Sequence, residues 1–146
     1  MLPAMVLIIN ILISSCDGLF PGLPVSITGR IDSFETDLNK TDRSSLYRNF
    51  HPTETANYNQ IKLPDFFSGS PLSETNIPFS INIPGTPVDQ ANGRKLVTGT
   101  LTHKYATLNI QFIMLQSGED WYIEELILPD VDAGGTPWAI RKIVYQ

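Results

Sequence analysis

Two histidines, His51 and His103, are the side chains of this sequence best suited to acid–base chemistry. An imidazole titrates near neutral pH, so a general base working at pH 7 is most naturally a histidine. His51 stands in a Phe-His-Pro sequence that is typical of a helix end, and His103 precedes Lys104 near the end of an expected strand. We therefore expect both histidines to occupy solvated capping or turn positions rather than a catalytic site.

Acidic residues offer two further arrangements. Asp32 and Glu35 lie on one turn of an expected helix, where two carboxylates can act as a pair, but a solvated helix face explains them more simply. The run at 130–135 (DVDAGG) begins like a calcium loop. Gly134 and Arg141 then stand at the fifth and twelfth positions, where that loop needs an oxygen ligand and a glutamate. We expect a flexible acidic loop there, and neither a metal nor another cofactor.

Nucleophilic catalysis has little basis in the sequence. There is no Gly-x-Ser-x-Gly elbow, and Cys16 is the only cysteine. A single cysteine also excludes an internal disulfide, so the folded part must depend on its hydrophobic core.

The position of Cys16 is the most informative feature of the chain. It follows the apolar run at 5–13 (MVLIINILI), which is too short to span a bilayer but has the length of a signal-peptide core. Ile13-Ser14-Ser15-Cys16 then resembles the lipobox of bacterial lipoproteins. The resemblance implies that residues 1–15 are a signal peptide removed before Cys16 and that the thiol carries a diacylglycerol.

Two other interpretations of this segment stay open. Cys16 can be a small buried hydrophobe in an N-terminal strand, although this leaves the neighbouring apolar run unexplained. The chain can also be a secreted eukaryotic protein, in which Asn39-Lys40-Thr41 would be a glycosylation acceptor. The lipobox interpretation has one departure, because a signal peptide usually begins with Lys or Arg and residues 1–4 (MLPA) contain neither.

Length and composition fit one folded domain behind a short tether. Residues 16–24 are rich in Gly and Pro, which predicts a tether, and the remainder of the 146-residue chain, 25–146, predicts a single domain. No charged side chain occurs before Cys16, so the net charge of −5 belongs entirely to the residues after it. An acidic domain lacks the basic stripe that would attract nucleic acid or anionic lipid, which argues against nucleic acid as a partner.

The spacing of apolar residues predicts helices first and strands afterwards. Helical periodicity extends over 25–39, a shorter helix is expected over 43–50 with Asp42 as its cap, and 53–67 reads as helical or turn-rich. Alternation predicts strands over 77–83, 95–103, 106–116, 121–128 and 138–146, separated by loops that include 84–94.

Three residues refine the expected sheet. Pro78 marks an edge strand, the apolar phase slips at Glu124-Glu125 and indicates a β-bulge, and Pro129 is expected to end its strand. The prediction is an α+β fold with N-terminal helices packed on a curved, mainly antiparallel sheet of about four to five strands.

This order of elements resembles the nuclear transport factor 2-like superfamily, a cone-shaped α+β fold that includes ketosteroid isomerases and scytalone dehydratase. The likeness rests on 27–38 as the first helix, 108–114 as the long curved strand and 118–123 (GEDWYI) as the final hairpin. A cystatin-like domain has a similar order. The resemblance implies a cone whose mouth carries aromatic and polar side chains. The enzymes of the superfamily need an Asp or His inside the cone with Tyr or Asp donors, and no such set maps onto this sequence.

Aromatic residues with polar tips suit the mouth of such a cone, although each one alone is explained more simply as core. The candidate pocket residues are Tyr47, Tyr58, Phe66, Phe67, Tyr105 and Trp121. The leading hypothesis is a noncatalytic envelope protein, held by lipid on Cys16 to the inner or outer membrane, facing away from the cytoplasm, that binds a small apolar ligand or a partner protein. The alternative is a small isomerase or dehydratase that acts on an apolar substrate.

Overall fold

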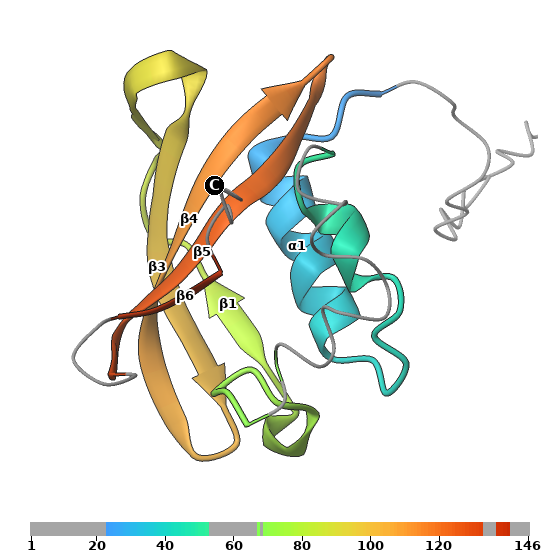
Figure 1. Cartoon of the computed structure of the whole chain (residues 1–146), viewed down its shortest axis with the longest axis vertical. Coiled ribbons are helices and arrows are strands. Elements are labelled where there is room, and N and C mark those ends of the chain that lie inside the picture. The colour runs from blue at the N-terminus through green and yellow to red at the C-terminus, as the bar shows by residue number, and fades with distance from the viewer. Residues whose placement is uncertain (1–22, 53–66, 68, 133–136, 141–146) are drawn as a thin grey trace, which may run out of the picture.

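The computed structural model describes residues 23–52, 67, 69–132 and 137–140. It is an α+β fold in which one α-helix lies against one side of a curved, open antiparallel sheet (Figure 1). The helical elements are α1 (Ile27–Leu38) and the 3-10 helices η1 (Leu46–Asn49), η2 (Glu74–Asn76) and η3 (Ala91–Gly93). The strands are β1 (Ser80–Asn82), β2 (Val88–Asp89), β3 (Lys95–His103), β4 (Ala106–Ser117), β5 (Asp120–Asp132) and β6 (Pro137–Ile140). The predicted fold class is confirmed.

Helix α1 forms where the apolar periodicity predicts it. The Ser26 hydroxyl accepts a hydrogen bond from the backbone N–H of Gly29 at 3.0 Å and so caps the helix start. Ile31, Phe34 and Leu38 are spaced by three and four residues and are all buried. This stripe packs α1 onto the sheet, and the helix ends at Asn39, whose N–H bonds the Glu35 carbonyl.

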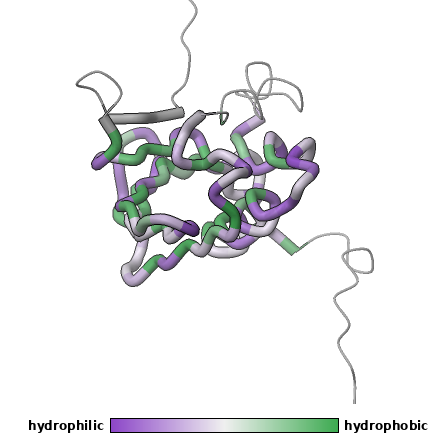
Figure 2. The backbone as a smooth tube through the Cα atoms, turned by 90° about the horizontal axis from the view of Figure 1, so that it is seen from below, coloured by the Kyte–Doolittle hydropathy of each residue, from purple (hydrophilic) through white to green (hydrophobic). Residues whose placement is uncertain are grey.

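The sheet follows the order β1-β3-β4-β5-β6, and β2 pairs with β3 as well. Along β4 the buried residues Ile110, Phe112 and Met114 alternate with more exposed ones, as a strand with one buried face requires. Figure 2 shows hydrophobic and hydrophilic stretches interspersed along the backbone of the domain. Strand β1 lies at the edge of the sheet, which confirms the inference from Pro78.

The predicted β-bulge is present in β5. Ile113 pairs with Glu125 and Met114 pairs with Ile123, so Glu124 is the extra residue between them. Glu124 is only 2% exposed. Its carboxylate receives two hydrogen bonds from the Arg94 guanidinium, at 2.5 and 2.6 Å. The bulge therefore buries a carboxylate that is paired with a partly exposed arginine.

Several predicted boundaries are wrong. The helix expected over 43–50 is only the 3-10 helix η1, because the Asp42 carboxylate accepts from the Ser44 N–H and forms a local turn. The strand expected over 77–83 is limited to β1, and the loop at 84–94 contains β2 and η3. The last strand begins at Pro137, one residue before its predicted start, and is described up to Ile140. Residues 141–146 and most of 53–67 lie outside the described residues.

Pro129 does not end β5, which continues to Asp132. The pairing of β4 with β5 stops at Gln111 and Ile127, and the pairing of β5 with β6 is irregular between Leu128 and Asp132. Pro129 thus falls where the regular ladder is interrupted, so its missing N–H breaks no regular strand pairing there.

The space between α1 and the sheet is filled with side chains. Phe34 of α1 contacts Phe50 and Phe112 edge to face, with ring centroids 6.1 and 5.9 Å apart. Both Phe34 and Phe112 have no exposed surface. The concave side of the sheet therefore holds a packed core under the middle of α1 rather than an open cone.

The N-terminal part of the chain is also bound to the start of β5. The Val25 N–H donates to the Asp120 carboxylate at 2.7 Å, and the Trp121 N–H donates to the Val25 carbonyl at 3.0 Å. The His51 N–H donates to the Ile123 carbonyl at 2.8 Å. Two segments that precede the sheet in the chain thus lie against β5.

Buried arginines make further connections through backbone carbonyls. Arg30 donates to the carbonyls of Trp121 and Arg48 at 2.8 and 3.2 Å. Arg43 donates to the carbonyls of Leu38 and Leu72, both at 2.6 Å, and burial lowers its pKa. These guanidinium groups join α1 and η1 to the rest of the domain.

Candidate functional site

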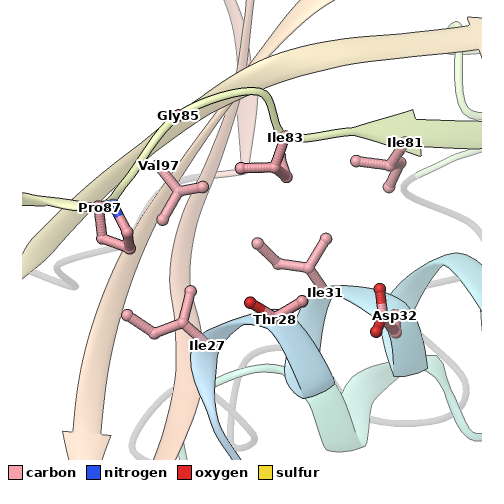
Figure 3. A pocket seen from close by; sticks show the side chains of 9 residues that line it. All are labelled: Ile27, Thr28, Ile31, Asp32, Ile81, Ile83, Gly85, Pro87 and Val97. Atoms are coloured by element: carbon pink, nitrogen blue, oxygen red, sulfur yellow. The ribbon is translucent and has the colours of Figure 1, made fainter.

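A groove between α1 and the edge of the sheet is the best candidate for a binding site (Figure 3). Its volume is about 190 Å³. The residues that line it are Ile27, Thr28, Ile31, Asp32, Ile81, Ile83, Gly85, Pro87 and Val97. Most are aliphatic, and those of α1 face those of β1 and the segment after it across the groove (Figure 3).

Glycine at position 99 allows β1 to lie this close to β3. A Cβ atom on Gly99 would be 2.3 Å from the Asn82 carbonyl oxygen and 2.6 Å from Cδ1 of Ile83. Only a residue without a side chain fits at position 99, where the backbone of Asn82 passes directly over β3. Ile83 can then lean toward α1 and form a wall of the groove (Figure 3).

Polar side chains of α1 close the groove at one end. The Glu35 carboxylate accepts the Ile81 N–H at 2.7 Å. The Asn39 side chain accepts the Phe79 N–H at 2.8 Å and donates to the Phe79 carbonyl at 2.9 Å. Along the outer edge of β1, these side-chain bonds take the place of the hydrogen bonds that a neighbouring strand would make. The last of them is to Ile81. Beyond it, beside the first half of α1, the groove opens.

Asp32 supplies the one charge among the residues that line the groove. Its side chain is exposed, and among the described residues no hydrogen bond or ion pair engages its carboxylate. Thr28 is exposed one turn earlier and carries a hydroxyl. A carboxylate next to an aliphatic wall can attract a group that is both apolar and positively charged. It has no acid–base partner there, since the lining contains no His, Tyr or second acid.

Other charged clusters of the described part stabilise the fold instead. The Asp37 carboxylate accepts from Lys40, Ser45 and Asn49 at 2.6 to 2.9 Å. Burial raises the pKa of Asp37, but these hydrogen bonds outweigh it and hold the pKa below its ordinary value. The hydrogen bonds from Arg94 to the Glu124 carboxylate raise the pKa of Arg94 above its ordinary value. Within this part no three His, Cys, Asp or Glu residues are grouped to hold a metal ion.

The aromatic residues predicted for the pocket do not come together in the groove. Phe67 is buried in the core, and Tyr47 and Trp121 are partly buried against it. Tyr105 is 70% exposed in the turn between β3 and β4, whereas Trp121 follows the turn at the other end of β4. Tyr58, Phe66 and the predicted lipidation site Cys16 lie outside the described residues.

The histidines lie outside the groove as well. His51 is 7% exposed, with its ring edge to face with Tyr122, so the expected solvated position is wrong for this residue. The packing of residues 50–51 against β5 explains the difference. His103 has the predicted turn role, because its Nδ1 atom accepts the Tyr105 N–H at 3.3 Å.

Three predicted surface roles also change. Glu35 is half-buried and bonded to β1, so it is not part of a solvated face with Asp32. Asp130 belongs to β5 and accepts from the Asn109 side chain at 2.6 Å, rather than lying in a flexible loop. Asn39 uses its side-chain N–H groups on the carbonyls of Glu35 and Phe79, which leaves the amide nitrogen unsuited to glycosylation in the folded state.

Sequence reasoning did not find the groove residues Ile81, Ile83 and Thr28 as a site. The one signal was Gly99 within a strand pattern, which is typical of a close backbone approach. It does not say which segment approaches.

Comparison with protein-family models finds no match. No curated protein matches the chain either. In the described residues, no helix is long and apolar enough to span a membrane.

Proposed function

We propose that this protein is an exported lipoprotein, anchored through lipid on Cys16, whose α+β domain binds an apolar group in the groove between α1 and β1 without catalysis. The observation that carries the binding role is the combination of aliphatic walls with the unpaired Asp32 carboxylate at the rim. Ligand sites characteristically have apolar walls and a few polar groups that set orientation. The Ile13-Ser14-Ser15-Cys16 sequence supports the anchor, and the protein then faces away from the cytoplasm.

The packing of the domain favours binding over the isomerase or dehydratase alternative. An enzyme of that kind needs a buried acid or base inside an open cone, with a hydroxyl donor in reach. Here Phe34 and Phe112 fill the concave side of the sheet, and Asp32 is exposed. We also propose membership of the nuclear transport factor 2-like superfamily, which the packing of helix α1 on a curved antiparallel sheet supports.

Binding in the groove is tested by NMR titration of the full chain with isobutanol, a small neutral apolar probe. We expect saturable shifts of the methyl groups of Ile27 and Ile83. Thr28→Trp should fill the groove and remove these shifts, because Thr28 is exposed and lines it. Thr36→Trp is the matched control, since Thr36 is an exposed α1 residue outside the lining. Equal shifts in both variants, or none in the wild type, would contradict the binding role.

The anchor is tested by expressing the chain and its Cys16→Ser variant in a bacterium with labelled palmitate. We expect label and membrane association only with the cysteine, because acyl chains contribute about 0.8 kcal/mol for each buried methylene. A wild-type chain without label, or equal membrane association of the two proteins, would exclude the lipoprotein assignment.

A further inference from the structure

We infer that the occupant of the groove is a short extended segment of a partner protein, which inserts an aliphatic side chain between α1 and β1 and places a Lys or Arg beside Asp32. This inference rests on the proposed binding function and names its partner. Three properties of the groove carry it: its size, its charge and the strand edge beside it.

The size fits a side chain better than a free metabolite. The groove holds about 190 Å³. An apolar cavity of about 150 Å³ accommodates one benzene ring, whereas sites for larger organic ligands usually enclose about 300–1,000 Å³. Ile27, Ile31 and Ile83 present aliphatic surface to this space (Figure 3). One branched aliphatic side chain is therefore the natural guest.

The charge selects a basic neighbour for that side chain. No described cation pairs with Asp32, and Glu35 on the next turn adds a second negative charge while it holds β1. The nearest basic residue of the same helix, Arg30, is directed to the carbonyls of Trp121 and Arg48. Two carboxylates beside an apolar groove attract a cation and repel an acidic segment.

The edge of β1 supplies main-chain partners. Phe79 and Ile81 direct their N–H groups away from β3, toward Asn39 and Glu35. The period of two, continued one residue past β1, puts the Ile83 N–H on the same outer side, where no hydrogen bond from it to a described residue is found. An extended segment in the groove can bond this edge, as in other cases of strand addition.

The test is an NMR titration of the full chain with the peptide acetyl-Thr-Val-Thr-Lys-Thr-amide, in which Val and Lys lie two positions apart and so point to the same side of an extended segment. We expect shifts at the backbone amides of Ile81 and Ile83 and at Thr28 to Asp32. A peptide with Glu in place of Lys should bind more weakly. So should a peptide with N-methyl groups on alternate amides, which cannot donate to the strand edge. Asp32→Asn should weaken binding of the lysine peptide about two- to five-fold, as expected for an exposed ion pair.

Controls separate this inference from the binding role itself. Glu119→Gln removes a charge from the exposed turn between β4 and β5 and should leave peptide affinity unchanged. If isobutylammonium binds as tightly as the peptide, or the N-methylated peptide binds equally well, the occupant is a small cation and the inference is wrong. If isobutanol binds but the lysine peptide does not, the groove is a binding site for another ligand class and the inference is again wrong. If neither binds, the proposed function fails as well.

Discussion

Replacing Arg94 with Met should destabilise the domain by leaving the Glu124 carboxylate buried without its cation. Methionine keeps most of the apolar stem of arginine and removes only the guanidinium. The Glu124 side chain is 3% exposed and that of Arg94 is 31% exposed, so the carboxylate depends on this one partner while water still reaches the cation.

The expected loss follows from these exposures. Breaking a fully buried ion pair by removing one partner costs about 3–5 kcal/mol. Partial solvation of Arg94 reduces this, so we expect a loss of about 2–3 kcal/mol in the free energy of unfolding for Arg94→Met at pH 7. The double variant Arg94→Met, Glu124→Leu should lose less than the two single variants together, because it leaves no unpaired charge.

Urea unfolding followed by far-ultraviolet circular dichroism measures these differences. At pH 7 the urea midpoint of Arg94→Met should lie below that of wild type, because the buried Glu124 carboxylate has lost its cation. The reasoning is refuted if Arg94→Met loses less than about 0.5 kcal/mol, the range of an ordinary surface substitution.

Three further results are expected. Gly99→Ala should lower the free energy of unfolding by about 1–3 kcal/mol, because its Cβ meets the Asn82 backbone. Gly85→Ala, whose Cβ meets nothing within 4 Å, is the control in the same thermal denaturation. In Asp37→Asn the free energy of unfolding should fall less steeply than in wild type as the pH is lowered. Since the folded-state pKa of Asp37 lies below the ordinary 3.8, its contribution is present above that pH and is lost as the pH falls below it. Urea midpoints from pH 6 to pH 2 should therefore converge with wild type at the acid end, and parallel profiles would contradict the assignment. In a Trp138→Phe background, the emission of the partly buried Trp121 should start blue-shifted and move to the red on denaturation. An unchanged emission maximum would place that ring in water.

The sheet was predictable because each long strand carries its own pattern. Strand β3 spans the predicted residues, and the phase slip at Glu124 identified the bulge. The sequence did not indicate that Arg94 would bond Glu124, since the contact between these side chains depends on how the strands pair and not on local spacing. The burial of His51 was not predictable either, because the Phe-His-Pro sequence indicates a helix end but not which distant residues pack against the ring.

The groove could not be predicted for a similar reason. Ile31 and Ile83 belong to separate elements, and each fits an ordinary core pattern by itself. Their facing arrangement arises from the crossing of Asn82 over Gly99 and from the bond between Glu35 and Ile81. Aromatic residues were predicted as pocket residues because they can form an apolar wall with a few polar tips, although Phe67 contributes to the core and Tyr105 to a turn.

The attachment of the N-terminal segments to β5 has a consequence for the order of folding. Val25 and Arg30 bond residues that lie 95 and 91 positions later in the chain. A 12-residue helix such as α1 is marginal in water on its own, so it gains lasting stability only when it docks. Helix α1 thus waits for a strand that is synthesised well after it. Under the export proposed above, this delay would keep α1 undocked during synthesis, and a loosely folded chain is the state that passage through a membrane requires.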